Sequence, residues 1–242
     1  MKRLLIALAV VLTVLAVVAL RAPAAWLADA VAARTKLRLV DARGTLWHGS
    51  ALLGVSNGRE TTLLPGRLEW TVTGVQPNRV WARLSHDWLT SPADVGLGPT
   101  GVHFAKGSAR LPAAVLAAAG APFNTLRPGG VLELRWSEAD LSGTALNGEL
   151  QVDWRDAQSA LSPVVPLGSY RLRVAGTAGP PSLELQTLAG PLEMRGSGKM
   201  EGSHIRFRGV AAVQRDMQPA LNGLLGLLGM RSGDKVLLAI DT

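Results

Sequence analysis

The sequence predicts a mainly β protein, in which a single N-terminal transmembrane helix precedes an antiparallel β domain with short capping helices. The first observation is that residues 4–20 carry no charge. The second is the 27 Gly and 14 Pro in 242 residues, which require frequent turns and leave little room for long helices. The third is that most later segments alternate apolar and polar residues at period two, as strands with one buried face do. These strands form either one curved sheet or two stacked similar halves.

The predicted helix begins after the basic residues Lys2 and Arg3 and covers Leu4 to Leu20. Seventeen residues at the helical rise span about 25 Å, slightly less than a bilayer core of about 30 Å. Arg21 and Trp26 follow, and both residue types favour the membrane interface. By the positive-inside rule, Lys2 and Arg3 predict a cytoplasmic N-terminus. We therefore expect a single-pass inner-membrane protein with most of its chain in the periplasm.

A cleaved signal peptide is the competing interpretation of this segment, because Ala22-Pro23-Ala24 has the A-x-A pattern of a cleavage site. However, the apolar run exceeds the usual length of about 7–15 residues, which favours an uncleaved signal anchor. Both interpretations export the rest of the chain. The expected division is an anchor over residues 1–28, a first half of the β domain over 29–127 and a second half over 128–242.

Twelve segments have the alternation of strands, and three have helical spacing. The expected strands cover residues 37–41, 46–55, 65–72, 80–85, 102–105, 131–136, 145–154, 169–174, 182–188, 191–195, 204–208 and 236–240. The expected helices cover 25–36, 111–119 and 218–230. Residues 64–70 resemble 146–154, and each half ends in a short apolar helix. We interpret this as a weak internal duplication with a boundary near Pro128, although convergent strand composition explains the similarity equally well.

Composition narrows the range of functions. The chain has 25 Lys and Arg against 18 Asp and Glu, a net charge of +7, but its basic residues are scattered and form no nucleic-acid motif. We therefore expect no nucleic-acid partner. The absence of cysteine excludes disulfides, thiolate catalysis and Cys-ligated metal sites.

Two glycine-rich segments resemble nucleotide-binding loops, but each lacks residues or a neighbouring element that such a loop requires. Gly96 to Gly101 has the spacing of the dinucleotide fingerprint, but a strand-like segment follows it where the fingerprint requires a helix. Gly196 to Lys199 has the end of a phosphate loop, but Glu193 replaces its first glycine and Met200 replaces the Ser or Thr that binds magnesium. We expect a turn at residues 196–199 and no cofactor.

The histidines give no catalytic or metal-binding pattern. His48, His86, His103 and His204 are too far apart for a local metal motif. His86-Asp87, beside Trp88, is the neighbourhood most like an active site, but no nucleophile elbow occurs in the chain. We therefore predict no catalytic residues and no metal site.

The octapeptide Gly44-Thr45-Leu46-Trp47-His48-Gly49-Ser50-Ala51 introduces the strand-rich region. If it is a strand, Trp47 is expected to be an ordinary core residue that wedges under the sheet. This octapeptide and several later segments, in order, resemble the type II secretion system protein N family. The residues that carry the resemblance, with an expected structural role, are Gly44, Trp47, Gly49, Trp70, Gly130, Trp154, Gly168, Tyr170, Gly190 and Gly196.

The resemblance implies a non-enzymatic inner-membrane and periplasmic component of type II secretion, the pathway that carries folded proteins across the outer membrane. Its implied partners are the inner-membrane platform, the secretin or both, together with inner-membrane lipid. The glycine- and leucine-rich strands also resemble periplasmic lipid-handling proteins of the AsmA type, so a lipid-binding or lipid-transfer domain is the alternative. A lipid carrier needs an unfilled apolar groove, whereas a scaffold fills that face with its own side chains.

Overall fold

A computed structural model of the chain describes residues 3, 6, 10, 13, 17–56, 58, 60–120, 123–177, 179–202, 204–213, 217–228, 230–232 and 235–241. Within these residues, no helix is long and apolar enough to cross a membrane. Lys2 lies outside them, and the predicted transmembrane segment is described only at positions 6, 10, 13 and 17–20, which are helical. The transmembrane helix therefore stays a prediction.

The described part of the chain is mostly strand, and its helices are short. The strands of the first half are β1 (Leu37–Gly44), β2 (His48–Ser56), β3 (Thr61–Gln76), β4 (Arg79–Ser85), β5 (Ala93–Gly98), β6 (Gly101–Phe104) and β7 (Gly107–Pro112). Those of the second half are β8 (Pro128–Trp136), β9 (Ala139–Ser142), β10 (Ala145–Ser159), β11 (Gly168–Thr177), β12 (Ser182–Ala189), β13 (Leu192–Glu201), β14 (His204–Val213), β15 (Met230–Ser232) and β16 (Lys235–Asp241). The helices are α2 (Ala24–Arg34), the 3-10 helix η1 (Ala113–Ala119), α3 (Phe123–Leu126) and α4 (Gln218–Leu228).

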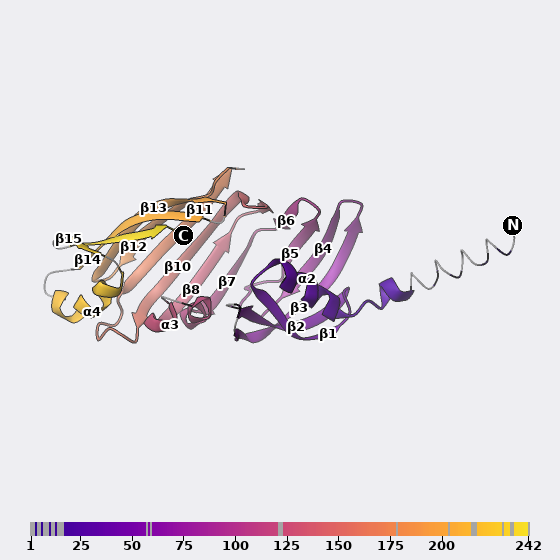
Figure 1. The fold of residues 1–242 in the computed structure, drawn as a ribbon, viewed down its shortest axis with the longest axis horizontal. Coiled ribbons are helices and arrows are strands. Elements are labelled where there is room, and N and C mark those ends of the chain that lie inside the picture. The colour runs from indigo at the N-terminus through magenta and orange to yellow at the C-terminus, as the bar shows by residue number, and fades with distance from the viewer. Residues whose placement is uncertain are drawn as a thin grey trace.

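The described strands form one antiparallel sheet of 16 strands, which confirms the predicted mainly β, antiparallel domain with short helices (Figure 1). Its order is β1-β2-β3-β4-β5-β6-β9-β10-β11-β12-β13-β14-β16-β15. Because β6 pairs with β9, the hydrogen-bonded sheet is continuous across residue 128. The origin of the two halves by duplication stays a prediction.

The sheet forks at β10, which is long enough to pair with two strands on one side. Ala145 to Asn147 pair with β9, and Leu150 to Ser159 pair with β8. β8 continues the second branch by pairing with β7. The outer edge of β7 is covered in turn by the β4–β5 loop, since Thr90 N–H donates to the Ser108 carbonyl and Arg110 N–H donates to the Trp88 carbonyl.

The two faces of the sheet differ in chemistry, as alternation requires. One face is apolar and carries the core. At the C-terminal end, Leu221, Leu224 and Leu225 of α4 pack on Leu192 and Ala211. At the N-terminal end, α2 packs on the same face through Ala24 and Leu27, which contact a cluster containing Ala51 and Trp70. The opposite face carries the polar side chains of the strands.

Four differences from the sequence-based expectations have physical causes. The strand expected from Leu46 begins at His48, because Thr45 to Trp47 form a turn. The helix expected over 111–119 is shorter, because its first two residues complete β7. Gly96 to Gly101 is a hairpin in which Gly98 pairs with Gly101. The turn expected at 196–199 is wrong: these residues continue β13, because Gly196 and Gly198 lie against the ring and backbone of Phe207 where a Cβ would clash.

Replacing Trp70 by Ala is expected to lower the free energy of unfolding by about 3–5 kcal/mol, because a side chain that is only 3% exposed would leave a cavity in the N-terminal core. Chemical denaturation of the purified protein measures this. Trp26→Ala is the control, since that side chain is 54% exposed and its loss should change stability by less than about 0.5 kcal/mol. Equal stability of Trp70→Ala and the wild type would contradict the assignment of Trp70 to the core.

Candidate functional site

The turn at Thr45 to Trp47 holds the chain that enters from the N-terminus. Trp47 Nε1–H donates to the Ala19 carbonyl at 2.7 Å, and Leu46 N–H donates to the Ala22 carbonyl at 2.8 Å. Trp47 is half-buried in this turn and is therefore not the core residue that the sequence predicted. It satisfies a carbonyl at the end of the N-terminal helix and fixes that helix against the sheet.

Trp70 is the tryptophan that fills the core beside this turn. Its Nε1–H donates to the Leu46 carbonyl at 3.1 Å. A Cβ on Gly49 would lie 2.5 Å from the Trp70 ring, so only glycine fits beneath it. Gly44, with φ of 85°, turns the chain into the Trp47 loop. The spacing of the octapeptide therefore reflects one tryptophan that holds the helix and two glycines that shape the turn around it.

The second half repeats this use of tryptophan and glycine. Trp154 Nε1–H donates to the Gly129 carbonyl at 2.8 Å. Gly130 has φ of 94°, and a Cβ there would lie 2.5 Å from the carbonyl oxygens of Arg155 and Asp156. These contacts form the bulge at which β8 and β10 shift register.

Tyr170 joins β11 to the loop before it and to the start of β13. Its hydroxyl lies 2.9 Å from the Leu192 carbonyl and 3.2 Å from the Leu167 carbonyl, and burial raises the pKa of the phenol. A Cβ on Gly168 would lie 2.8 Å from that hydroxyl, and one on Gly190 would overlap the Gly168 backbone. Tyr170 and these glycines have packing roles in this structure.

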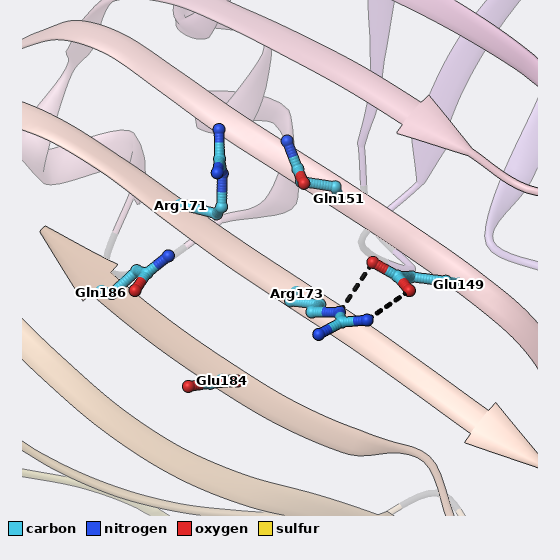
Figure 2. A pocket seen from close by; sticks show the side chains of 6 residues that line it. All are labelled: Glu149, Gln151, Arg171, Arg173, Glu184 and Gln186. Atoms are coloured by element: carbon cyan, nitrogen blue, oxygen red, sulfur yellow. Dashed lines mark hydrogen bonds and ion pairs between the residues drawn. The ribbon is translucent and has the colours of Figure 1, made fainter. Parts of the chain in front are cut away.

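The polar face carries a ladder of charges across β10, β11 and β12. Figure 2 shows Glu149, Gln151, Arg171, Arg173, Glu184 and Gln186, which line a pocket on this face. The Arg173 guanidinium donates to both oxygens of Glu149, at 2.7 and 2.6 Å. These bonds hold the pKa of the Glu149 carboxyl below its usual value. The pocket therefore presents paired charges.

Asp153 is the buried member of the same ladder. It is fully buried, and Arg171 donates to its two oxygens at 2.7 and 2.8 Å. Arg155 donates a further bond at 3.0 Å. The Arg171 hydrogen bonds are the main reason that the pKa of Asp153 lies below its usual value. A carboxylate held ionised by two arginines is a structural ion pair and a poor general base at neutral pH.

An apolar pocket of about 290 Å³ opens on the opposite face, at the fork of the sheet. Its apolar lining residues are Phe104, Trp136, Ala139, Leu146, Leu150 and Val174. Trp136 is held in the fork by a 2.8 Å hydrogen bond from Nε1–H to the Ala105 carbonyl. The sheet backbone around the pocket is already paired in the β-ladders. The one charged lining residue is Glu149, whose carboxylate is bound by Arg173, so the pocket offers mainly apolar contact.

A row of apolar residues continues from this pocket across the first half. Successive strand pairs place Val75, Val80, Leu97, Val102, Leu141 and Leu146 opposite one another. Val75 is 63% exposed and Leu97 is 44% exposed. Five strand spacings of about 4.8 Å make this row about 24 Å long.

His86 is buried in the loop after β4, where burial lowers the pKa of its imidazole. Its Nδ1 accepts from Trp88 N–H at 3.1 Å, and its ring lies 4.6 Å from the Trp88 ring. Nε2 has no hydrogen-bond partner among the described residues. Because Nδ1 is an acceptor, the proton of the neutral ring is on Nε2. No nucleophile is seen bonded to the ring in the described part of the chain, so the geometry indicates a loop-packing role.

The remaining candidate residues do not gather into one site. Arg3, Arg21 and Trp26, predicted at the membrane interface, are exposed, and Trp26 lies in the first turn of α2. Within the described ranges, no group of three or more histidines and carboxylates could hold a metal ion.

Comparison with known families decides the assignment of the chain. The family described as "Type II secretion system (T2SS), protein N" matches residues 35–237. The chain belongs to the type II secretion system protein N family. No curated protein and no solved structure matches it. The resemblance predicted from the octapeptide and the later segments is thereby confirmed, and this protein N chain is a component of the type II secretion system.

Sequence reasoning missed the charged pocket of Figure 2 and the apolar pocket at the fork of this protein N chain. The sequence did contain a pattern that indicates the charge ladder, because Glu149, Gln151 and Asp153 alternate on one strand and Arg171 and Arg173 alternate on the next. Their register had to be known before they could be paired. The apolar pocket had no local signal, because its lining comes from five strands and from a fork that no segment shows by itself.

Unfolding should become easier as the pH falls below about 6.5, partly because of His86. Its pKa is lowered in the folded state, so the unfolded chain binds the proton first and folding stability is lost through that range. His86→Asn keeps an acceptor near the Nδ1 position and cannot titrate, so its stability should fall less between about pH 7.5 and 5.5. Denaturation midpoints at each pH measure the difference. An identical dependence of stability on pH in His86→Asn and in the wild type would contradict the assignment.

Proposed function

We propose that this protein is a non-enzymatic, single-pass inner-membrane component of type II secretion that acts by binding other components from the periplasmic side. The family match over residues 35–237 carries this proposal. The predicted anchor supports the location, with Lys2 and Arg3 in the cytoplasm. An anchor also raises the effective concentration of the domain near partners in the same membrane.

The contacts of Trp47 support a mechanical role for this anchor. The indole bond to Ala19 and the Leu46 bond to Ala22 join the N-terminal helix to the sheet at two points. Ala22 and Ala24 are 3% and 1% exposed, so this junction is packed. A helix held in this way would orient the sheet relative to the membrane.

The first strand offers a surface suited to partner binding. In the described part of the chain, β1 pairs only with β2, and such an edge can accept an added strand. Leu37 and Val40 are 45% and 36% exposed on it. A bulge between Val40 and Arg43 interrupts the ladder, so the regular part available for pairing is Leu37 to Val40.

Crosslinking in cells tests the proposal. A photoreactive amino acid at Val40 of the full-length protein should yield adducts with inner-membrane platform proteins or the secretin. The same group at Val75, which is 63% exposed at the far end of β3, is the control and should yield fewer. Deletion of the protein should reduce secretion of folded substrates. An undiminished secretion level after deletion would contradict the proposed function.

A second candidate function, binding of lipid, is favoured by the open apolar pocket. A peptide laid face-on over Leu146, Leu150 and Val174 would leave its own N–H and C=O groups unpaired, because the sheet backbone there is paired already. A hydrocarbon chain has no such groups. The apolar row of about 24 Å exceeds the length of an acyl chain that spans one leaflet, about 15 Å.

Native mass spectrometry of the purified protein tests the second function. Bound phospholipid or fatty acid is expected in the wild type and should be lost in Val174→Glu, which places a charge in the pocket. Leu63→Glu is the control, because Leu63 is 50% exposed on β3 and does not line this pocket. Absence of lipid from the wild type, or equal lipid in all three proteins, would contradict lipid binding.

A further inference from the structure

The polar face of β12, β13 and β14 contains an open trough of about 930 Å³. Its cationic lining residues are Arg195, Lys199, Arg206 and Arg208, and its carboxylates are Glu184 and Glu201. Both glutamates and all four cations are exposed. We call this surface the C-terminal trough. The α4 helix covers the opposite, apolar face of these strands, where Leu221 and Leu224 pack on Leu192 and Ala211.

The trough differs from the centre of the polar face in its charge pairing. At the centre Arg173 binds Glu149 and Arg171 binds Asp153, and in the first half Arg83 binds Asp94. In the trough, Arg206 binds Glu201 at 2.8 Å. Within the described residues, the side chains of Arg195, Lys199 and Arg208 make no ion pair and no hydrogen bond.

The remaining carboxylate does not neutralise these cations. Glu184 lies opposite Arg173 in the β11–β12 register and contributes to the raised pKa of that guanidinium. Three cations of the trough therefore lack a compensating charge, and a ligand with negative charge would supply it.

The register of β13 and β14 sets the spacing of the donors. Ser197 is opposite Arg208 and Gln186 is opposite Arg195. Arg195 and Arg208 are thus diagonal neighbours, with Cα atoms about 7–8 Å apart. Alternate residues of an extended peptide are about 7 Å apart and point to the same side. Two acidic side chains at positions i and i+2 of an extended segment therefore match the two guanidiniums, with Ser197 between them as a further donor.

The position of the trough favours a protein over lipid headgroups as the source of the negative charge. In Figure 1, α2 and β1 lie toward one end of the long axis, and β13 and β14 lie toward the other. If the N-terminal helix is in the membrane, as proposed above, lipid headgroups are at the end opposite the trough. We propose that the C-terminal trough binds an acidic, extended segment of a partner protein at the membrane-distal end of the molecule. This inference rests on the proposed anchoring and partner-binding function.

Binding of poly-L-glutamate to the full-length protein tests the recognition chemistry. The double variant Arg195→Gln/Arg208→Gln should bind this probe about tenfold more weakly, because two charge contacts are lost. Arg79→Gln/Arg83→Gln is the matched control, since it removes two arginines from the same face in the first half, and it should bind within about twofold of the wild type. The affinity of the wild type should fall as salt shortens the Debye length below about 10 Å. Equal binding by both double variants, or none by the wild type, would overturn the proposal.

Two further measurements separate the alternatives. Vesicles containing phosphatidylglycerol should bind wild type and Arg195→Gln/Arg208→Gln equally; vesicle binding that depends on these arginines would overturn the choice of a protein ligand. In a deletion strain, Arg195→Gln/Arg208→Gln should reach wild-type levels in the membrane and restore secretion poorly. If deletion abolishes secretion and the variant restores it fully, the trough assignment fails and the proposed function stands. If deletion leaves secretion intact, the proposed function itself fails.

Discussion

Four tryptophan indoles bind backbone carbonyls where this sheet would otherwise be interrupted. Trp47 binds Ala19 at the N-terminal junction, Trp70 binds Leu46 in the following turn, Trp136 binds Ala105 at the fork, and Trp154 binds Gly129 at the β8 bulge. Ala19, Leu46 and Ala105 lie outside the strands, and Gly129 lies next to the register shift between β8 and β10. An unpaired carbonyl shielded from water costs free energy comparable to a lost hydrogen bond. The rings of Trp70, Trp136 and Trp154, whose bonds are partly buried, therefore provide both apolar area and a donor. The Trp47 bond is exposed and adds a second donor to the Ala19 carbonyl, which also accepts from Ala22 N–H. The fork and the junction depend on these contacts.

Glycine has a complementary role at the same places. A Cβ on Gly49 would enter the Trp70 ring, and one on Gly107 would enter the Trp136 ring. At Gly130 a Cβ would instead enter the carbonyls of the bulge next to Trp154. A large ring can reach a backbone carbonyl of another strand only if the intervening strand has no side chain there. The glycine and tryptophan positions on which the predicted resemblance rested therefore have a packing explanation in this structure.

The parts of the structure that were predictable from the sequence are those that depend on local patterns. Alternation at period two predicted most strands, because a sheet with one apolar and one polar face imposes that pattern on each strand separately. The fork of β10, the closure of β7 by Trp88 and Thr90, and the role of Trp47 were not predictable. Each depends on contacts between residues far apart in the chain, such as the 28 positions between Trp47 and Ala19. The short strands β5, β7 and β9 were missed for the same reason, since pairing and not composition makes them strands.

The division between the two faces limits how this family member can act. On the apolar face, α2 and α4 fill the two ends and leave the pocket near Leu150 open. On the polar face, the ion pairs of Asp153 and Glu149 neutralise the centre, whereas Arg195, Lys199 and Arg208, farther along on β13 and β14, make no ion pair among the described residues. A paired arginine has part of its charge and of its donors engaged by its carboxylate, whereas an unpaired arginine has all of them free for a new anion. Electrostatic recognition is therefore favoured at the C-terminal end of the polar face and apolar recognition at the fork on the opposite face, so the two surfaces can be occupied independently.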